Sequence, residues 1–461
     1  MRILLVQPQW SLTLVGFKKL ARPEPLALEV LAAALPHHDV QILDLRVDES
    51  PGALATALAS FRPHIVGVTG YTTDVPQAQA VLAEAKAADE SIYTVVGGHH
   101  ASLCPQDFDL PSVDFVVVGE GEVTFPELVD ALEAGRDYRG ILGLIYRENG
   151  KQVFTGPRPP LRNLDDSPMP DRAKTAAYRD RYFFRFWQGA YTMESARGCP
   201  FRCNFCSVWK FYQGKCRLRS PEKVVEQIAN IPGNFVAFVD DNFLQSLPRA
   251  QAIYERIKEL GIKKRYWIQA RSDSIVRRPD LIEKWASIGL STVLVGLEGF
   301  REDQLAKVNK SNSVKANEKA VEIMHQHNVD IWGAFIVDPE WVRSDFDTLI
   351  QYVRSLKITF PQFTVLTPLP GTDLFREKVN ELITSNFAKF DFLHTVLPTR
   401  LPLEEFYENM ARLYASTTLS LAELREKIRS GNIPSDQLRS IRGLMQELTN
   451  PKAYLVGGEP R

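Results

Sequence analysis

The stretch YTMESARGCPFRCNFC, residues 191–206, places three cysteines directly after a short apolar run. The run Tyr191–Ser195 predicts a buried strand, and Cys199, Cys203 and Cys206 follow it in a CxxxCxxC pattern. Thiolates are soft ligands that suit zinc and iron–sulfur clusters, so three of them on one loop predict a metal site. The sequence on either side indicates which metal and which fold.

An iron–sulfur cluster suits this loop better than zinc does. Three thiolates can hold three irons of a four-iron cluster and leave the fourth iron open, whereas a structural zinc site normally takes four protein ligands. Cys216 is a conceivable fourth zinc ligand, and no histidine lies between residues 101 and 324. Structural zinc remains the alternative. The chain has 5 cysteines, and this odd number does not resemble a secreted disulfide framework.

From about residue 190 to 375 apolar runs alternate with amphipathic stretches. The expected strands are Tyr191–Ser195, Phe235–Asp240, Tyr266–Ala270, Thr292–Leu297, Ile331–Val337 and Gln362–Thr367, with helices such as Pro221–Asn230, Arg249–Leu260 and Pro279–Ile288 between them. Six strand–helix units of this spacing predict a full or partial (β/α) barrel whose site lies at the carboxyl ends of the strands. The residues at the next three strand ends are Asp240, Asp241 and Asn242, then Gln269 and Arg271, then Glu298.

The first 135 residues show a similar alternation. The expected strands are Ile3–Gln7, Val40–Leu45, Ile65–Thr69, Tyr93–Val96 and Phe115–Val118, and the expected helices include Leu26–Ala34, Gly52–Phe61 and Val75–Ala88. This pattern predicts a Rossmann-like, doubly wound parallel sheet of the α/β class, which binds ligands beyond the carboxyl ends of its strands. Glycines there let a ligand approach the backbone closely, although glycines also simply end strands in ordinary domains.

The remaining segments set the expected domain boundaries. A hairpin (Leu142–Arg147 and Val153–Thr155) and two proline-rich passages predict a linker, and helices are expected at Leu403–Ala415, Leu419–Arg429 and Ser435–Leu448. The expected domains are 1–140 (Rossmann-like), 141–185 (linker), 186–378 (barrel) and 379–461 (small helical C-terminal region).

Composition restricts the partners of this 461-residue chain. Its 55 basic and 56 acidic residues give a formal net charge of -1, so we expect no nucleic-acid partner. No window supplies 18 uninterrupted apolar residues, so we expect no membrane span, and the N-terminal run does not resemble a secretory signal. The expected location is the cytoplasm.

The cysteine motif, with Phe205 before its last cysteine, resembles that of the radical S-adenosylmethionine (SAM) superfamily. The resemblance implies a [4Fe-4S] cluster held by Cys199, Cys203 and Cys206, whose open iron chelates SAM so that one electron splits the sulfonium and yields a 5′-deoxyadenosyl radical. Gly296-Leu-Glu298 is similar to the family's Gly-Ile-Glu-Ser. The SAM-binding residues implied by this resemblance are Asp240, Asp241, Gln269, Arg271 and Glu298.

The N-terminal half resembles the cobalamin-binding domains found ahead of many radical SAM domains. The matching residues are Val96-Gly-Gly-His-His-Ala101 and Val118-Gly-Glu-Gly-Glu122. The chain lacks Asp-x-His-x-x-Gly, so no residue is marked as a lower axial ligand to cobalt. The cobalamin contacts that the resemblance implies are Gly70, Tyr71, Thr72, Gly97, Gly98, His99, Gly119, Glu120 and Gly121.

The tail at residues 393–414 is similar to that of ring methylases, including hopanoid C-3 methylases. This resemblance implies methylation of an unactivated carbon of a small molecule, with an external one-electron donor such as flavodoxin or ferredoxin. The alternatives are a non-methylating radical SAM reaction with the same domains, and a cobalamin or iron–sulfur carrier or sensor. Methylthio transfer is disfavoured because that family needs three N-terminal cysteines, and only Cys104 occurs here. No side chain is assigned a catalytic role, and Cys104 and Cys216 are expected to be packed free thiols.

Overall fold

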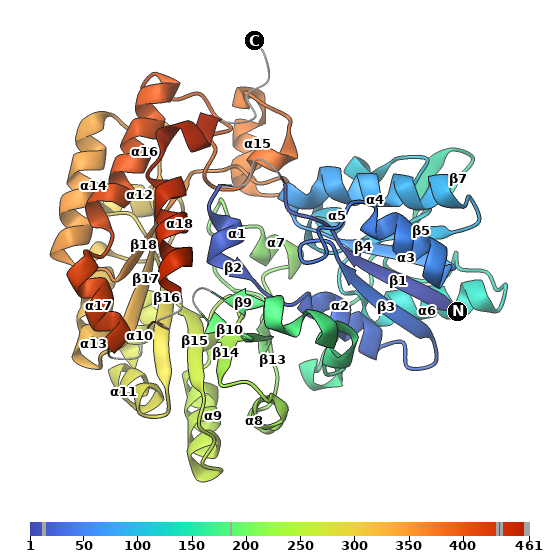
Figure 1. Cartoon of the computed structure of the whole chain (residues 1–461), viewed down its shortest axis with the longest axis horizontal. Helices are drawn as coiled ribbons and strands as arrows, with labels where there is room; N and C mark the ends of the chain where they lie inside the picture. The colour runs from blue at the N-terminus through green and yellow to red at the C-terminus, as the bar shows by residue number, and fades with distance from the viewer. Residues whose placement is uncertain (12–14, 185–186, 430–432, 434–436, 456–461) are drawn as a thin grey trace. The chain divides into compact units, whose positions relative to one another are not determined.

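The computed structural model describes residues 1–11, 15–184, 187–429, 433 and 437–455. The chain forms two compact units (Figure 1). The first contains residues 24–181, the N-terminal strand and Asn386–Ala388, and the second contains most of the rest.

A seven-stranded sheet forms the centre of the first unit, in the order β3-β1-β4-β5-β6-β7-β8. Its strands are β1 (Arg2–Gln7), β3 (Asp39–Asp44), β4 (Ile65–Thr69), β5 (Tyr93–Gly97), β6 (Phe115–Val117), β7 (Leu144–Glu148) and β8 (Lys151–Phe154). The first five in this order are parallel, while β7 and β8 continue the sheet as an antiparallel hairpin. The strand order reverses between β1 and β4, where doubly wound sheets bind ligands, so the predicted Rossmann-like sheet is confirmed.

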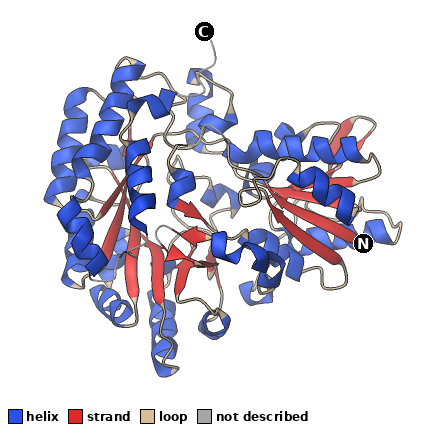
Figure 2. Cartoon of the chain, viewed as in Figure 1, coloured by secondary structure: helices blue, strands red, loops and turns tan. Residues whose placement is uncertain are grey.

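Helices cover both faces of this sheet (Figure 2). They are α2 (Leu26–Ala33), α3 (Ala53–Phe61), α4 (Val75–Ala88), α5 (His99–Leu103) and α6 (Gly121–Glu133). Alternate side chains of β1 enter two separate cores: Leu4 and Val6 pack with α3 and α4, and Ile3 and Leu5 pack with α2 and α6. Period-2 alternation with both faces apolar explains why β1 reads in the sequence as one continuous hydrophobic run.

The second unit contains a six-stranded parallel sheet whose spatial order follows the sequence. Its strands are β11 (Tyr191–Met193), β14 (Phe235–Phe238), β15 (Arg265–Ala270), β16 (Leu290–Glu298), β17 (Asp330–Val337) and β18 (Phe360–Val365). The covering helices include α8 (Pro221–Asn230), α9 (Leu247–Glu259), α11 (Pro279–Ser287), α13 (Val314–Gln326) and α14 (Arg343–Ser355). With β11 and β18 at its edges, this sheet is the partial form of the predicted barrel.

The C-terminal helices belong to the second unit, as does a short N-terminal segment. These helices are α16 (Leu403–Thr417), α17 (Leu421–Arg429) and α18 (Leu438–Leu448), and the predicted helix start at Ser435 lies outside the described residues. Strand β2 (Ala21–Arg22) pairs with β9 (Phe183–Phe184), and Gly16 N donates to Glu447 Oε1 at 2.8 Å. The described residues 15–23 therefore pack within the second unit. In the described part of the chain, no helix combines the length and apolarity needed to span a bilayer.

Two buried glutamates bind the segment before the barrel to α2. The side chains of Glu24 and Glu29 have no exposed surface, and both pair with Arg172 and Arg179. Burial, together with the neighbouring Glu24 charge, raises the pKa of Glu29 to about 7. A carboxyl group whose pKa is raised by folding stabilises the fold when it is protonated, and this contribution is lost as the pH rises from about 4.5 to about 7.

We therefore predict that Glu29→Gln changes the pH dependence of stability. The free energy of unfolding of the wild type should fall relative to that of the variant, by on the order of 3 kcal/mol, between about pH 4.5 and pH 7. Urea unfolding across this pH range measures the difference. The exposed Glu84→Gln on α4 is the control, and a parallel pH profile for wild type and Glu29→Gln would contradict the prediction.

Candidate functional site

The three cysteines lie on a loop that a short antiparallel ribbon closes at its base. Strand β12 (Ala196–Arg197) pairs with β13 (Arg217–Leu218), and the loop between them contains all three cysteines, the short helix α7 (Val208–Phe211) and Cys216. No disulfide bond restrains this loop, since every cysteine of the chain is a free thiol. Inside the loop, Trp209 Nε1 donates to Cys203 O at 2.9 Å and Cys206 N donates to the same carbonyl at 3.2 Å.

The buried carboxylate of Asp240 fixes the start of this loop. Its Oδ1 accepts hydrogen bonds from Ser195 N at 2.6 Å and Ala196 N at 3.0 Å, and Ser195 Oγ donates to Oδ2 at 2.5 Å. Burial nevertheless raises the pKa of Asp240 to about 6, because the desolvation outweighs these bonds. Asp240, predicted to contact SAM, thus has both carboxylate oxygens bonded to the residues that lead into the cysteine loop.

The adjacent Asp241 and Gly198 form the next contact. Gly198 N donates to Asp241 Oδ2 at 3.1 Å, and burial raises the pKa of Asp241 to about 7. Gly198 has a φ of 89°, and a Cβ there would lie 2.1 Å from Lys215 O. Only glycine permits this approach of the two arms of the ribbon just before Cys199.

The thiols fit a metal cluster as a donor set. Burial raises the pKa of Cys199 and of Cys203, and that of Cys206 to about 12. Iron binding would replace the thiol protons, which these buried groups do not release at neutral pH. Cys216 lies close enough to Cys199 for the two charges to interact, and burial raises its pKa to about 11. Three free thiols on one anchored loop match the ligand set of a cluster with an open iron.

Residues 307–312, here called the strap, hold the other side of the cysteine loop. Asn204 N donates to Val308 O at 3.3 Å and Asn309 Nδ2 donates to Arg202 O at 2.7 Å. Arg271, at the end of β15, donates from Nη2 to the carbonyls of Lys310 at 3.0 Å and Ser311 at 2.9 Å. The guanidinium of Arg271 also lies 3.5 Å from the ring centroid of Phe201, within the cysteine loop. Arg271 therefore contacts both the loop and the strap.

Glu298 ends β16 beside a lysine that sequence reasoning missed. Lys310 Nζ lies 2.7 Å from Glu298 Oε1; Lys310 is buried, and the side chain of Glu298 is 11% exposed. A Cβ on Gly296 would lie 2.3 Å from Glu298 Oε1 and 2.7 Å from Lys310 Nζ, so the pair packs directly over that glycine. In the sequence, Lys310 is distinguished only by its place in a polar stretch after a short helix, and that place alone does not indicate a functional residue.

Two further polar side chains, those of Asn242 and Gln269, lie near strand ends at this edge of the sheet. Asn242 is 2% exposed, and neither atom of its side-chain amide has a hydrogen-bond partner among the described residues. Gln269 is half-buried near the end of β15. An unmatched buried amide costs roughly 1–3 kcal/mol, which a polar ligand could offset, so this observation fits SAM.

In the first unit, the residues predicted to contact cobalamin follow the strands β4, β5 and β6 at one edge of the sheet. Tyr71 is 69% exposed, and its ring centroid lies 6.1 Å from that of His99. Burial, with a contribution from His100, lowers the pKa of His99 to about 4, so its imidazole is neutral at neutral pH. No described atom lies within 4 Å of where a Cβ of Gly119 would be. Glu120 instead accepts a hydrogen bond from Leu161 N at 3.1 Å.

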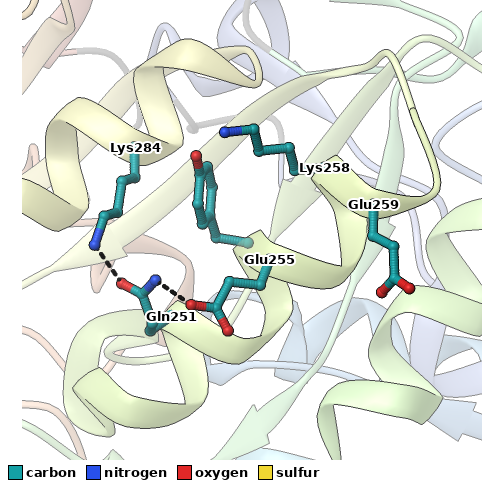
Figure 3. A pocket seen from close by; sticks show the side chains of 6 residues that line it. Gln251, Glu255, Lys258, Glu259 and Lys284 are labelled. Carbon is teal, nitrogen blue, oxygen red and sulfur yellow. Dashed lines mark hydrogen bonds between the residues drawn. The ribbon is translucent and has the colours of Figure 1, made fainter.

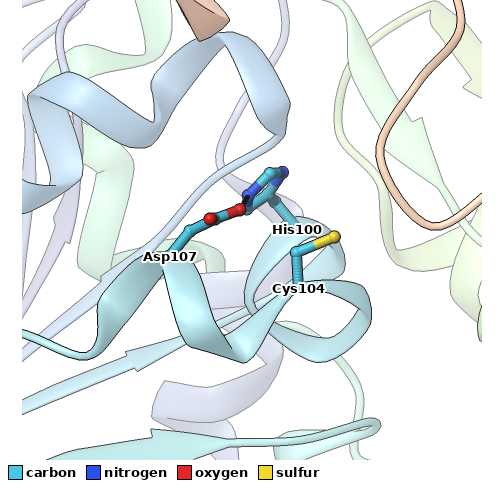
Figure 4. Close-up of side chains that lie close together, drawn as sticks. All are labelled: His100, Cys104 and Asp107. Carbon is cyan, nitrogen blue, oxygen red and sulfur yellow. Dashed lines mark hydrogen bonds and ion pairs between the residues drawn. The ribbon is translucent and has the colours of Figure 1, made fainter. Parts of the chain in front are cut away.

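His100, Cys104 and Asp107 form a compact group below this edge (Figure 4), with potential ligand atoms within 4.8 Å of one another. His100 Nδ1 lies 3.1 Å from Thr72 Oγ1 and Nε2 lies 2.9 Å from Asp107 Oδ2. Both ring nitrogens therefore have protein partners, and His100 links the Gly70–Thr72 turn to the chain after α5. Burial raises the pKa of Cys104 to about 11, as expected for a packed thiol.

A hollow of about 660 Å³ lies on the helices α9 and α11 (Figure 3). Lys284 Nζ donates to Gln251 Oε1 at 3.0 Å, and Gln251 Nε2 donates to Glu255 Oε1 at 2.6 Å. The residues that line the hollow are Gln251, Tyr254, Glu255, Lys258, Glu259 and Lys284. None of them belongs to the predicted site.

A Rossmann-like domain followed by a partial barrel with a three-cysteine loop defines a radical SAM enzyme with a cobalamin-type domain. Comparisons with known proteins agree: the family described as B12 binding domain matches residues 14–129, and the Radical SAM superfamily matches residues 193–353. Hopanoid C-3 methylase of Methylococcus capsulatus is 31% identical to this chain, over 99% of this chain and 89% of that protein. The chain therefore belongs to the cobalamin-dependent radical SAM enzymes.

Two other proteins show the range of this similarity. The anaerobic magnesium-protoporphyrin IX monomethyl ester cyclase of Rubrivivax gelatinosus is 28% identical, over 86% of this chain and 73% of that protein. The structure of the radical SAM methyltransferase TsrM from Kitasatospora setae, with cobalamin and a [4Fe-4S] cluster bound, superposes with a TM-score of 0.68, over 91% of this chain and 89% of that chain at 19% identity. At this identity the structural match establishes the fold alone.

We predict that Gly198→Ala abolishes cluster retention, because a Cβ 2.1 Å from Lys215 O forces the ribbon open. Gly214→Ala is the matched control: Gly214 also has a positive φ, 67°, but no described atom lies within 4 Å of its Cβ position. The control should lose about 1–2 kcal/mol of stability and keep its iron. Iron analysis after anaerobic reconstitution and thermal unfolding of the apoprotein measure both effects, and equal iron contents would refute the steric argument.

We also predict that Cys203→Ala removes the iron–sulfur absorption and the 5′-deoxyadenosine formed from SAM under reducing conditions. Cys216→Ala should keep both, since its thiol is not one of the three in the CxxxCxxC motif. Absorption spectra and chromatography of the nucleoside product provide the measurements. Retention of the nucleoside in Cys203→Ala, or zinc without iron in the wild type, would overturn the cluster assignment.

Proposed function

We propose that this chain methylates an unactivated carbon of a small-molecule substrate, using SAM, a [4Fe-4S] cluster and cobalamin. The observation that carries the proposal is the cysteine loop anchored at the strand ends of the barrel, in a chain that also contains the cobalamin-type domain. The 31% identity to a hopanoid C-3 methylase over nearly the whole chain favours methyl transfer as the outcome.

When bound, the reduced cluster supplies the electron that splits the SAM sulfonium bond, and cobalamin carries the methyl group. The chain's own residues bind and orient these groups. Cys199, Cys203 and Cys206 hold the cluster, and Asp240 acts on it by fixing the backbone of residues 195–196. Hydrogen abstraction by a carbon radical needs no side-chain base, and we assign no side chain to that role.

For SAM, the proposed contacts are Asp241, Gln269, Arg271 and Glu298. Arg271 is positioned by two strap carbonyls and by Phe201, and a guanidinium so held is suited to a carboxylate. Asp241 is positioned by Gly198 N, next to the first cysteine. Of these residues Arg271 is buried, and the low dielectric around its guanidinium strengthens an electrostatic contact to a ligand carboxylate.

For cobalamin, the proposed contacts lie at the carboxyl ends of β4, β5 and β6. Exposed Tyr71 offers an aromatic face, and no described atom lies within 4 Å of where a Cβ of Gly119 would be. The proposed cobalamin contacts are Gly70, Tyr71, Thr72, Gly97, Gly98, His99, Gly119, Glu120 and Gly121. The electron would come from an external donor of the flavodoxin or ferredoxin type.

A second candidate is a non-methylating radical SAM reaction with the same cofactors. It is favoured by the 28% identity to a magnesium-protoporphyrin IX monomethyl ester cyclase. Both candidates share the cleavage of SAM and differ in whether the SAM methyl group is transferred.

A substrate-free assay tests the proposal. We expect the anaerobically reconstituted protein, given methyl-deuterated SAM, hydroxocobalamin and titanium(III) citrate, to form 5′-deoxyadenosine and S-adenosylhomocysteine and to transfer deuterated methyl to the added cobalamin. Mass spectrometry detects all three. In Cys203→Ala the nucleoside should disappear while cobalamin still co-elutes in gel filtration. Nucleoside without methyl transfer would favour the second candidate, and the absence of both products would overturn the proposal.

A further inference from the structure

Lys310 lies where two predicted SAM contacts meet. Its side chain is 9% exposed, and its ammonium lies 2.7 Å from Glu298 Oε1. Its backbone carbonyl accepts a hydrogen bond from Arg271 Nη2 at 3.0 Å. One residue of the strap thus contacts, through different atoms, the side chains that end β15 and β16.

The strap also places Lys310 next to the cluster loop. Hydrogen bonds at 3.3 Å (Asn204 N to Val308 O) and 2.7 Å (Asn309 Nδ2 to Arg202 O) hold the residues on both sides of Cys203. The residues that flank Cys203 are therefore hydrogen-bonded to the strap that carries the Lys310 ammonium, and the Glu298 carboxylate lies 2.7 Å from that ammonium.

The backbone at Glu298 adopts a strained conformation that the contacts of the Lys310–Glu298 pair maintain. Glu298 has a φ of 62°, in the left-handed region, and the register of β16 against β17 shifts between Gly296 and Glu298. Such a conformation is unfavourable in a residue other than glycine and persists where surrounding contacts impose it. Here the ammonium of Lys310 supplies such a contact, and Gly296, which has no side chain, leaves room for the pair.

We propose that Lys310 is a positioning residue of the cluster-and-SAM site, which holds the Glu298 carboxylate in place and, with Glu298, sets the charge that the cluster experiences. The inference rests on the proposed function, because it requires the cluster and SAM to bind. A cluster held by three thiolates gains one negative charge on reduction, so a nearby cation favours the reduced state and a nearby anion the oxidised state. Without Lys310 the Glu298 charge is unopposed, and without Glu298 the Lys310 charge is unopposed.

The test is a charge cycle on the reconstituted protein without SAM. Lys310→Gln should lower the ratio of reduced to oxidised cluster about tenfold at a fixed potential, a shift of about 59 mV for one electron. Glu298→Gln should shift the midpoint in the opposite direction, and the double variant should return towards the wild type. Potentiometric titration followed by electron paramagnetic resonance measures the midpoint. Opposite signs from two substitutions at one contact are not produced by a general loss of structure.

SAM binding and folding complete the experiment. Binding of radiolabelled SAM to the oxidised holoprotein should weaken about tenfold in Lys310→Gln and stay within twofold in Lys310→Arg. Lys319→Gln is the control, since Lys319 pairs with Glu322 at 2.8 Å on an exposed face. An unshifted midpoint in Lys310→Gln, or shifts of one sign in both single variants, would overturn the inference. A wild type that assembles no iron–sulfur cluster would refute the proposed function itself, and apoprotein melting temperatures identify any misfolded variant.

Discussion

The hydrogen bonds from residues 195–196 to the carboxylate of Asp240 are the interaction on which the cluster site depends. They join the end of β14 to the chain that leaves β11, so the cysteine loop starts from a fixed backbone. A buried carboxylate is costly, and three donors at 2.5–3.0 Å offset part of that cost. Desolvation still outweighs them, which raises the pKa of Asp240 to about 6. Loss of the carboxylate would leave two backbone N–H groups unmatched where the loop begins.

The opposite side of the loop depends on a different kind of contact. The strap makes its bonds through carbonyls and amides, and its one charged side chain in the site, Lys310, serves Glu298. Breaking a buried ion pair by removing one partner leaves an uncompensated charge, whereas removing both is far less damaging. In this site the ion pair of Lys310 with Glu298 therefore keeps each of the two charges compensated. The same logic applies in the first unit, where two buried glutamates are matched by Arg172 and Arg179.

Periodicity predicted the strands well and the contacts between distant segments poorly. The predicted strand Ile65–Thr69 is β4 as observed, because a short apolar run ended by glycine has few other ways to be buried. The linker predicted for residues 141–185 includes a hairpin that the structure places in the first sheet as β7 and β8, because pairing partners across a sheet leave no local signal in the sequence. Lys310 was missed for the same reason: it is one lysine in a polar turn, and its partners lie 12 and 39 residues away.

The sequence at a strand end also does not distinguish polar side chains that hydrogen-bond to the backbone from polar side chains that remain available to a ligand. Asp240, Asp241 and Asn242 are consecutive, yet Asp240 has both oxygens bonded within the protein, Asp241 accepts from Gly198 N, and the Asn242 amide has no partner among the described residues. Buried polar groups are nearly always hydrogen-bonded, so an unmatched amide is a position where a polar partner would be stabilising. The three neighbours thus differ in their contacts within the described residues: Asp240 anchors the loop through both oxygens, Asp241 accepts one bond where the loop begins, and the Asn242 amide has no partner.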